Sequence, residues 1–353
     1  MPGTSSGHGY DRYAAFQALD PSENMKTVPV KQFIFDLYDT VKQSVQPLHP
    51  RNQSEKTRAL VAVGLVSFFW GTTWLASKKG VEHMPGLQLA GIRQLIGGGF
   101  YIVYFFLKGY GFPSRQQFFQ FIWMSILMFV ISNGFSTWSV QYIPSGLGAV
   151  IGAISPIWIA LFTVLLFREV KLNLITIAGL ILGFGGILVI FSDYLQALFN
   201  SSFAFGIILG IIATMTWALG TIYTVRHARN LNAYYSLGWQ MFLSGIILTV
   251  VSRISGQYIP LHNVNPIAWY SIAYLVVIGS IITFGAFIYA LKRLPAAQAS
   301  IYAYINPIVA VVVGAILNHE KLNIVIAVGT LVTLLGVFLV NTGFKKAKLK
   351  DEN

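Results

Sequence analysis

Aromatic and small polar residues recur within the long apolar stretches of this 353-residue chain. Such side chains bind small molecules when they converge, because ligand sites are mostly apolar pockets that hold a few well-placed polar groups. Tryptophan and tyrosine also gather where membrane helices meet water, so the set as a whole predicts a cavity better than any single member does. The candidate cavity residues are Trp70, Thr73, Trp74, Arg93, Asn133, Thr137, Trp138, Ser155, Trp158, Trp217, Tyr223, Gln240, Tyr289, Tyr302 and Asn306.

Arg93 is the one charged residue that falls inside an apolar stretch rather than at its end. An arginine at membrane depth faces protein or water and finds polar partners there. Two roles stay open for it. Its guanidinium binds the carboxylate of a ligand through paired hydrogen bonds, or it is structural and reaches the membrane interface or the carbonyls at a neighbouring helix end.

Two prolines and two glutamates also carry alternative interpretations. Pro156 and Pro307 fall inside expected helices. Each removes a backbone hydrogen bond, which predicts either a hinge or a fixed kink. Glu169 and Glu320 follow these helices. They predict either a gate or a cap on the N-terminus of the next helix, where negative charge is favourable.

The acidic residues all lie outside the apolar stretches or at their ends. Carboxylates within the membrane are the usual proton or sodium relays, because their ionisation there is costly. Their absence favours a neutral or zwitterionic solute that moves down its own gradient. The chain has no cysteine, which excludes disulfides and thiolate ligands. We expect neither a metal nor a cofactor.

The composition indicates which elements must position these residues. The chain is 55% hydrophobic and 10% charged, against about 25% charged residues in soluble proteins. A soluble domain could not expose so apolar a surface to water. The net charge of +12 does not indicate a nucleic-acid partner, because the basic residues punctuate apolar stretches instead of clustering on one face.

A membrane-spanning helix needs about 20 predominantly apolar residues. The 52 uncharged residues 116–167 are too many for one span, and the turn Gln141–Pro144 divides them. A β-barrel would show short alternating segments, which the sequence lacks. We therefore predict an all-α integral membrane protein with ten spans, near 59–77, 87–107, 117–138, 145–167, 172–191, 203–224, 232–252, 267–290, 296–317 and 322–342.

The ten spans form two copies of one unit. Trp70 corresponds to Trp217, Arg93 to Gln240 and Glu169 to Glu320, at separations of 147 and 151 residues. The pairs Pro144 with Pro295, Pro156 with Pro307 and Trp138 with Tyr289 repeat the pattern. Because five spans are an odd number, the second unit enters the membrane from the opposite side. The sequence thus predicts two inverted five-helix repeats, 59–191 and 203–342, an architecture that places a ligand near the midplane.

Basic residues near the span ends predict the orientation. With the N-terminus inside, 15 of them lie on the cytoplasmic side and four, Lys78, Lys79, Arg253 and Lys321, lie outside. Both termini are then cytoplasmic. Residues 1–58 form a polar tail in which apolar residues at helical spacing over 30–46 predict an amphipathic helix on the membrane or on its own domain. Residues 343–353 form a basic C-terminal tail.

Several segments resemble the EamA family of the drug/metabolite transporter superfamily. They are FWGTTW (69–74), AGIRQLIGG (90–98), PSGLGAVIGAISPIWIALFTVLLFREVKL (144–172) and its second copy LPAAQASIYAYINPIVAVVVGAILNHEKL (294–322). The resemblance covers about 59–342 and leaves out the N-terminal tail. It implies a ten-helix fold similar to the YddG-type amino acid exporters, with a central cavity lined by helices 1, 3, 4, 6, 8 and 9.

These observations favour a secondary transporter in a bacterial cytoplasmic (inner) membrane. It would export amino acids or related metabolites by alternating access, with a small solute and the lipid bilayer as partners and a monomer as a plausible state. A proton-coupled drug/metabolite antiporter is the alternative, followed by a channel or a structural membrane protein. The sequence lacks a GxxxxGK[ST] loop for ATP, and its few histidines near the spans lie at or near loops, so an enzyme is disfavoured.

Overall fold

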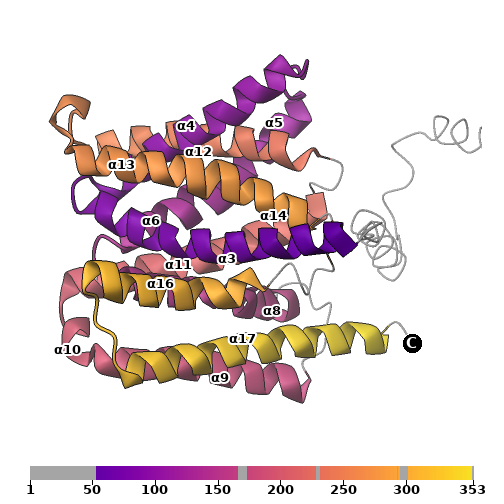
Figure 1. The fold of residues 1–353 in the computed structure, drawn as a ribbon, viewed down its shortest axis with the longest axis vertical. Coiled ribbons are helices and arrows are strands. Elements are labelled where there is room, and N and C mark those ends of the chain that lie inside the picture. The colour runs from indigo at the N-terminus through magenta and orange to yellow at the C-terminus, as the bar shows by residue number, and fades with distance from the viewer. Residues whose placement is uncertain (1–52, 166–172, 228–230, 292, 295–300, 352–353) are drawn as a thin grey trace, which may run out of the picture. The chain divides into compact units, whose positions relative to one another are not determined.

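The computed structural model describes residues 53–165, 173–227, 231–291, 293–294 and 301–351, and every regular element within these ranges is a helix. The predicted amphipathic helix 30–46 and Glu169 lie outside the described residues. Figure 1 shows the helices as a layered bundle in which long helices run roughly side by side. The all-α class predicted from the sequence is confirmed.

The first repeat contains five spans, two of which are divided. The segments are α3 (Gln53–Val81), α4 (Gly86–Leu107), α5 (Arg115–Met124) with the π-helix η1 (Ser125–Asn133) and α6 (Gly134–Ser139), α7 (Ser145–Ala153) with α8 (Ser155–Leu165), and α9 (Leu174–Asp193). The short helix α10 (Leu195–Leu198) leads to the second repeat.

The second repeat follows the same plan. Its segments are α11 (Ser201–His227), α12 (Ala233–Ile254), the 3-10 turn η2 (Leu261–Asn263), α13 (Pro266–Tyr274) with the π-helix η3 (Leu275–Ile282) and α14 (Thr283–Leu291), α16 (Tyr302–Asn318), and α17 (Ile324–Asp351). In the described part of the chain, nine spans are long and apolar enough to cross a membrane, and α16 is a shorter apolar helix of 17 residues.

The observed boundaries differ from the predicted ones at two places. Helix α3 begins before the predicted residue 59 and continues to Val81. Helix α17 runs on to Asp351, so the predicted basic tail 343–353 is mostly a helical continuation of the last span. Hydropathy marks only the apolar part of a helix, whereas backbone hydrogen bonding continues into its polar ends.

Matching asparagines begin the fifth helix of each repeat. Asn173 accepts a hydrogen bond from the backbone N–H of Thr176, and Asn323 accepts one from Ile326. Their amide nitrogens reach the far end of the partner helix, where Asn173 donates to the Gly343 carbonyl (2.7 Å) and Asn323 to the Asp193 carboxylate (2.8 Å). Each asparagine therefore caps its own helix and joins α9 to α17.

The two repeats interlock. Helices α4 and α12 pack against each other, as do α9 and α17, which lie side by side in Figure 1. Helix α3 of the first repeat packs on α13, α14 and α16 of the second, while α11 of the second packs on η1, α6 and α8 of the first. The first helix of each repeat is therefore held mainly by the third and fourth spans of the other.

Glycines allow the close helix pairs. A Cβ on Gly98 of α4 would lie 2.8 Å from the Gly238 carbonyl of α12. On the other pair, a Cβ on Gly179 of α9 would lie 2.8 Å from the Gly336 carbonyl of α17. Only a residue without a side chain lets the two backbones approach this closely.

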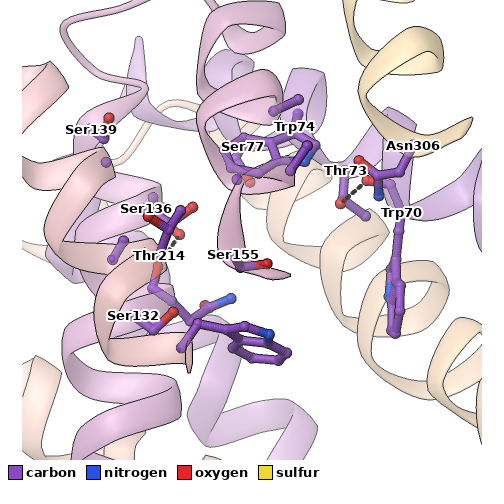
Figure 2. Close-up of a pocket in the computed structure, with 18 of the residues that line it drawn as sticks. Trp70, Thr73, Trp74, Ser77, Ser132, Ser136, Ser139, Ser155, Thr214 and Asn306 are labelled. Atoms are coloured by element: carbon purple, nitrogen blue, oxygen red, sulfur yellow. Dashed lines mark hydrogen bonds between the residues drawn. The ribbon is translucent and has the colours of Figure 1, made fainter. Parts of the chain in front are cut away.

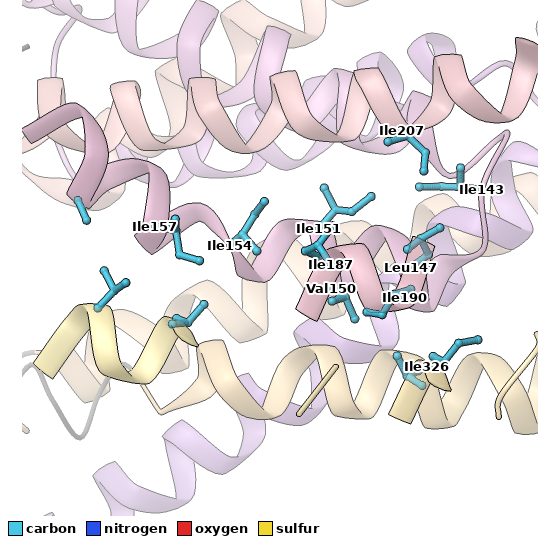
Figure 3. Packing of buried hydrophobic residues seen from close by; sticks show 14 residues of the cluster. Ile143, Leu147, Val150, Ile151, Ile154, Ile157, Ile187, Ile190, Ile207 and Ile326 are labelled. Atoms are coloured by element: carbon cyan, nitrogen blue, oxygen red, sulfur yellow. The ribbon is translucent and has the colours of Figure 1, made fainter. Parts of the chain in front are cut away.

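The fourth span of the first repeat breaks where Pro156 was expected to lie inside one helix. Helix α7 ends at Ala153, and Pro156 sits in the first turn of α8, where a missing N–H costs nothing. Figure 3 shows Ile151, Ile154 and Ile157 of this span within a buried isoleucine-rich cluster that also includes residues of α9 and α17. Pro307, by contrast, lies inside α16 as predicted.

Candidate functional site

A cavity of about 250 Å³ lies among helices of both repeats. This volume is near the lower end of the roughly 300–1,000 Å³ of small-molecule sites. The first, third, fourth, sixth, eighth and ninth spans contribute, as the family resemblance implied, and so do α4 and α12. The candidate residues that the structure brings together in its lining are Trp70, Thr73, Trp74, Arg93, Asn133, Thr137, Ser155, Trp217, Tyr302, Asn306 and Pro307.

The remaining candidates lie outside this lining. Trp138 packs on Phe205, and its repeat mate Tyr289 lies under the guanidinium of Arg293. Trp158 joins the isoleucine-rich cluster. Both faces of a membrane helix are apolar, so the sequence does not show which face turns inward.

Three further candidates also lie outside the lining. Tyr223 and Gln240 interact with residues of their own helices, and Pro156 is the third. Tyr223 stacks on His227 at 4.4 Å between ring centroids. Gln240 donates to the Ser236 hydroxyl one turn earlier (2.7 Å). Pro156 is absent from the cavity lining, although its neighbour Ser155 is present.

Small hydroxyl residues that the sequence did not single out form much of the polar lining. Figure 2 shows Ser132, Ser136 and Thr214 together on one side of the cavity, with Trp70, Thr73 and Asn306 on the other. Serines and threonines are common in membrane helices, where they bond back to their own backbone. Thr73, for example, donates to the Trp70 carbonyl (2.7 Å). Without the fold, nothing distinguishes those that face a cavity.

The π-helical segments bring several of these groups to the cavity. Both π-helices lie in the third span of their repeat, and η1 supplies Phe129, Ser132 and Asn133 while η3 supplies Ser280. A π turn widens the helix, and such turns often occur at functional sites. The Ile278 carbonyl accepts both the backbone N–H and the side-chain hydroxyl (2.6 Å) of Thr283, five residues further on.

An aromatic wall stands beside η3. The indole of Trp70 packs edge-on to Phe284 and Tyr302, each 5.0 Å away between ring centroids. Its Nε1–H donates to the Gly279 carbonyl (3.2 Å). The bond fixes the orientation of the ring, so this part of the cavity offers a rigid apolar surface.

Polar residues of α4 lie next to this wall. Arg93 is 8% exposed, and its Nε–H donates to the Ser280 hydroxyl (3.4 Å). Gln94 donates to the Asn133 side chain (2.8 Å). The described lining contains no Asp or Glu. Within the described ranges, acidic residues, histidines and cysteines also form no group that could hold a metal ion.

The turn between α6 and α7 is held by two charges at one end of the bundle. The Lys78 ammonium donates to the carbonyls of Val140 (2.9 Å) and Ile143 (3.2 Å). The Glu320 carboxylate accepts the backbone N–H groups of Ser145 (2.8 Å) and Gly146 (3.0 Å). We refer to Lys78, Glu320 and the turn 140–146 as the clamp. It begins one residue beyond Ser77 and Ser139 of the cavity lining.

The clamp corrects the expectation that Glu320 caps the next helix. Its carboxylate lies on the N-terminus of α7, in the other repeat, where the helix dipole favours negative charge. His319 has a left-handed backbone (φ 51°) that ends α16 and turns the chain back, and the Glu320 N–H then donates to the Gly314 carbonyl. Gly314 leaves room for the carboxylate, because a Cβ there would lie 2.6 Å from Glu320 Oε2.

An ion pair lies beside the clamp. The ammonium of Lys321 contacts the Asp193 carboxylate at 2.7 Å, and Asn323 bonds the same group. In the adjoining loop, burial and the nearby carboxylates of Asp193 and Glu320 raise the pKa of Tyr194 to about 12. This phenol is therefore neutral at physiological pH.

The fold and the site together define an integral membrane protein of two homologous repeats that enclose a cavity of metabolite size. The sequence pattern of the EamA-like transporter family matches residues 57–192 and, a second time, residues 204–342. The chain therefore belongs to the EamA-like transporter family. The predicted membership is confirmed, and the family is one of transporters rather than enzymes.

Similar proteins agree with this assignment. The chain is 25% identical over 300 residues to the uncharacterized transporter YvbV of Bacillus subtilis, which spans 84% of this chain and 95% of YvbV. It is 29% identical over 275 residues to the uncharacterized inner membrane transporter YedA of Escherichia coli, covering 78% and 87% of the two chains. One crystal structure shares the fold with a TM-score of 0.57 at 15% identity, over 81% of this chain and 97% of the other.

Proposed function

We propose that this protein is a secondary transporter that moves a small organic solute through the central cavity by alternating access. The observation that carries the proposal is the cavity itself, which is lined by matching helices of both repeats, α3 with α11 and η1 with η3. In an inverted repeat, the rocking of one half against the other exposes such a cavity to each side in turn. The clamp joins the two repeats beside Ser77 and Ser139 of the cavity lining.

We further propose export of amino acids or related metabolites without a buried carboxylate relay. The lining combines aromatic rings with hydroxyl and amide groups, a mixture that suits small amphiphilic solutes. Among the described acids, Glu320 is engaged by two backbone amides and Asp193 by Lys321, and neither lines the cavity. Movement down the gradient of the solute itself is the simplest energetics for such a site.

The location and orientation belong to the same proposal. The inner membrane assignment of YedA supports a bacterial cytoplasmic membrane. The distribution of basic residues supports cytoplasmic termini, with the clamp on the outer side. A monomer suffices, because the described residues of one chain build the cavity lining.

Counterflow in liposomes tests the transport proposal. Purified protein is reconstituted with a panel of unlabelled amino acids and related metabolites inside, and the uptake of each labelled solute is followed with protein-free liposomes as the control. A carrier gives saturable uptake that internal solute accelerates. Uptake that neither saturates nor responds to internal solute indicates a channel and contradicts alternating access. A strict requirement for an imposed proton gradient indicates the antiporter alternative.

A further inference from the structure

Arg93 is the one charged side chain among the described residues that line the cavity. It donates a single hydrogen bond to a described residue, from Nε to the Ser280 hydroxyl. The terminal nitrogens of the guanidinium, which form its fork of paired donors, have no such partner. None of the described lining residues carries a negative charge. A buried cation without a counter-ion is costly, so an anionic group of a ligand would be favourable here.

The fold does not need this charge. Gln240 occupies the equivalent position of the second repeat and bonds the Ser236 hydroxyl of its own helix, outside the cavity lining. Helices α4 and α12 contact each other through equivalent glycines, Gly98 and Gly245, whose Cβ atoms would meet the opposing backbone. Since α12 packs in the same way with a neutral residue, the arginine is not a requirement of helix packing.

The surroundings of Arg93 leave room for a ligand beside an apolar surface. A Cβ on Gly279 would lie 3.4 Å from a terminal nitrogen of Arg93, so the glycine keeps that side open. The same residue accepts the indole N–H of Trp70 (3.2 Å). The phenol of Tyr101 donates to the Ser280 carbonyl (2.9 Å) and so holds this part of η3 against α4. The guanidinium and the Trp70 ring are thus anchored to adjacent residues of η3.

We propose that Arg93 binds the carboxylate of the transported solute and that Trp70, Phe284 and Tyr302 contact its apolar part. The inference rests on the proposed transport function and deepens it, because it names the substrate class as small organic carboxylates with an apolar group. Arginine pairs with carboxylates through two parallel hydrogen bonds. Neutral or cationic analogues leave the guanidinium uncompensated. Because the second repeat offers no equivalent cation, the solute binds in one orientation.

Matched carboxylate and amide pairs test the inference in the purified full-length protein. The probes are 3-phenylpropionate with 3-phenylpropionamide, and phenylalanine with phenylalaninamide, measured by calorimetry and by counterflow. We expect the carboxylate to bind at least about tenfold tighter than its amide in one or both pairs, the equivalent of about 1.4 kcal/mol. Equal binding within both pairs, or no binding of either carboxylate, overturns the inference.

Variants assign the preference to Arg93. Arg93→Gln introduces the residue of the other repeat and should abolish the discrimination within the pair. Arg93→Lys keeps the charge but not the paired geometry, and should retain a weaker preference. Arg253→Gln is the matched control, because Arg253 stacks on Tyr258 at the exposed end of α12. A folded Arg93→Gln protein that still prefers the carboxylate overturns the assignment. If that variant does not fold, the wild-type comparison and Arg93→Lys decide.

The two proposals fail in different ways. If the carboxylates bind selectively but no solute crosses the membrane by counterflow, the transport proposal falls and the carboxylate site stands. If solutes cross by saturable counterflow while amides match carboxylates, the transport proposal stands and the inference about Arg93 falls.

Discussion

The carboxylate of Glu320, at the end of α16, caps the backbone amide of Ser145 at the start of α7, 2.8 Å away and in the other repeat. A hydrogen bond to a charged group contributes about 1.5–3 kcal/mol. Because Gly146 donates to the second carboxylate oxygen, a single side chain joins the ends of two spans that line the cavity. Separation of the repeats at this end must break both bonds.

Replacement of Glu320 by glutamine should open the clamp end of the cavity. The amide has a single acceptor oxygen and no charge, so at least one backbone N–H loses its partner. The chain has no cysteine, so Ser77→Cys provides one reporter in the cavity lining. We expect its labelling by a maleimide to accelerate about tenfold, the equivalent of about 1.4 kcal/mol. Glu82→Gln is the control, because Glu82 forms an exposed pair with Lys79. An unchanged rate would show that the Glu320 carboxylate does not hold this end of the cavity closed.

Lys78 and Glu320 should act together, because they hold the two sides of one turn. Lys78→Gln removes the donors to Val140 and Ile143 and should also accelerate labelling at position 77. Once one charge is gone, the turn is already released. The free-energy effect of the double variant on labelling should therefore be smaller than the sum of the two single-variant effects by at least about 0.5 kcal/mol. The labelling rates of the wild type, the two single variants and the double variant complete the double-mutant cycle. Lys79→Gln is the control, because it removes a neighbouring lysine that is not part of the clamp. Full additivity would show that the two charges act separately.

Gly98 and its neighbour Gly99 should respond in opposite ways to substitution by alanine. A Cβ on Gly98 would lie 2.8 Å from the Gly238 carbonyl, so overpacking should cost about 1–3 kcal/mol. A Cβ on Gly99 would meet nothing within 4 Å, and alanine there should be neutral or stabilising by up to about 1 kcal/mol. Thermal unfolding in detergent compares the two variants. Equal unfolding temperatures would mean that α4 and α12 do not rely on this close contact.

The sequence predicted the number and order of the helices because a membrane imposes a length and a polarity on each span. It also revealed the two repeats, since Trp70 and Trp217 or Glu169 and Glu320 keep their spacing. It could not show which span of one repeat packs on which span of the other. Glu320 illustrates the limit, because its cap lies 175 residues away in the chain, at Ser145.

The sequence predicted which types of residue line the cavity, but not every individual residue that does so. Trp70 and Trp217 line the cavity, whereas Trp138 and Trp158 pack elsewhere. A soluble helix shows its buried face by apolar periodicity, but a membrane helix is apolar towards both lipid and protein. The π turns also escaped prediction. Ser280 reaches the cavity through η3, and no residue pattern marks where a helix widens by one residue.

Thr283 should influence ligand binding although it does not line the cavity. Its buried hydroxyl donates to the Ile278 carbonyl five residues back, which also accepts the Thr283 backbone N–H at the end of the π turn. Thr283→Val removes the hydroxyl's hydrogen bond, which contributes about 0.5–1.5 kcal/mol to holding the π turn in place. The segment that holds Gly279 and Ser280 should then shift, which displaces the partners of Trp70 and Arg93.

We expect Thr283→Val to raise the KM for a transported carboxylate severalfold and to leave its maximal rate nearly unchanged, because the variant alters binding geometry and not the clamp. Thr221→Val is the matched control, since the Thr221 hydroxyl donates to the Trp217 carbonyl four residues back in a regular helix. Concentration-dependent counterflow separates KM from the maximal rate. If both variants leave KM unchanged, the π turn of η3 does not position the cavity residues, and its role is confined to packing.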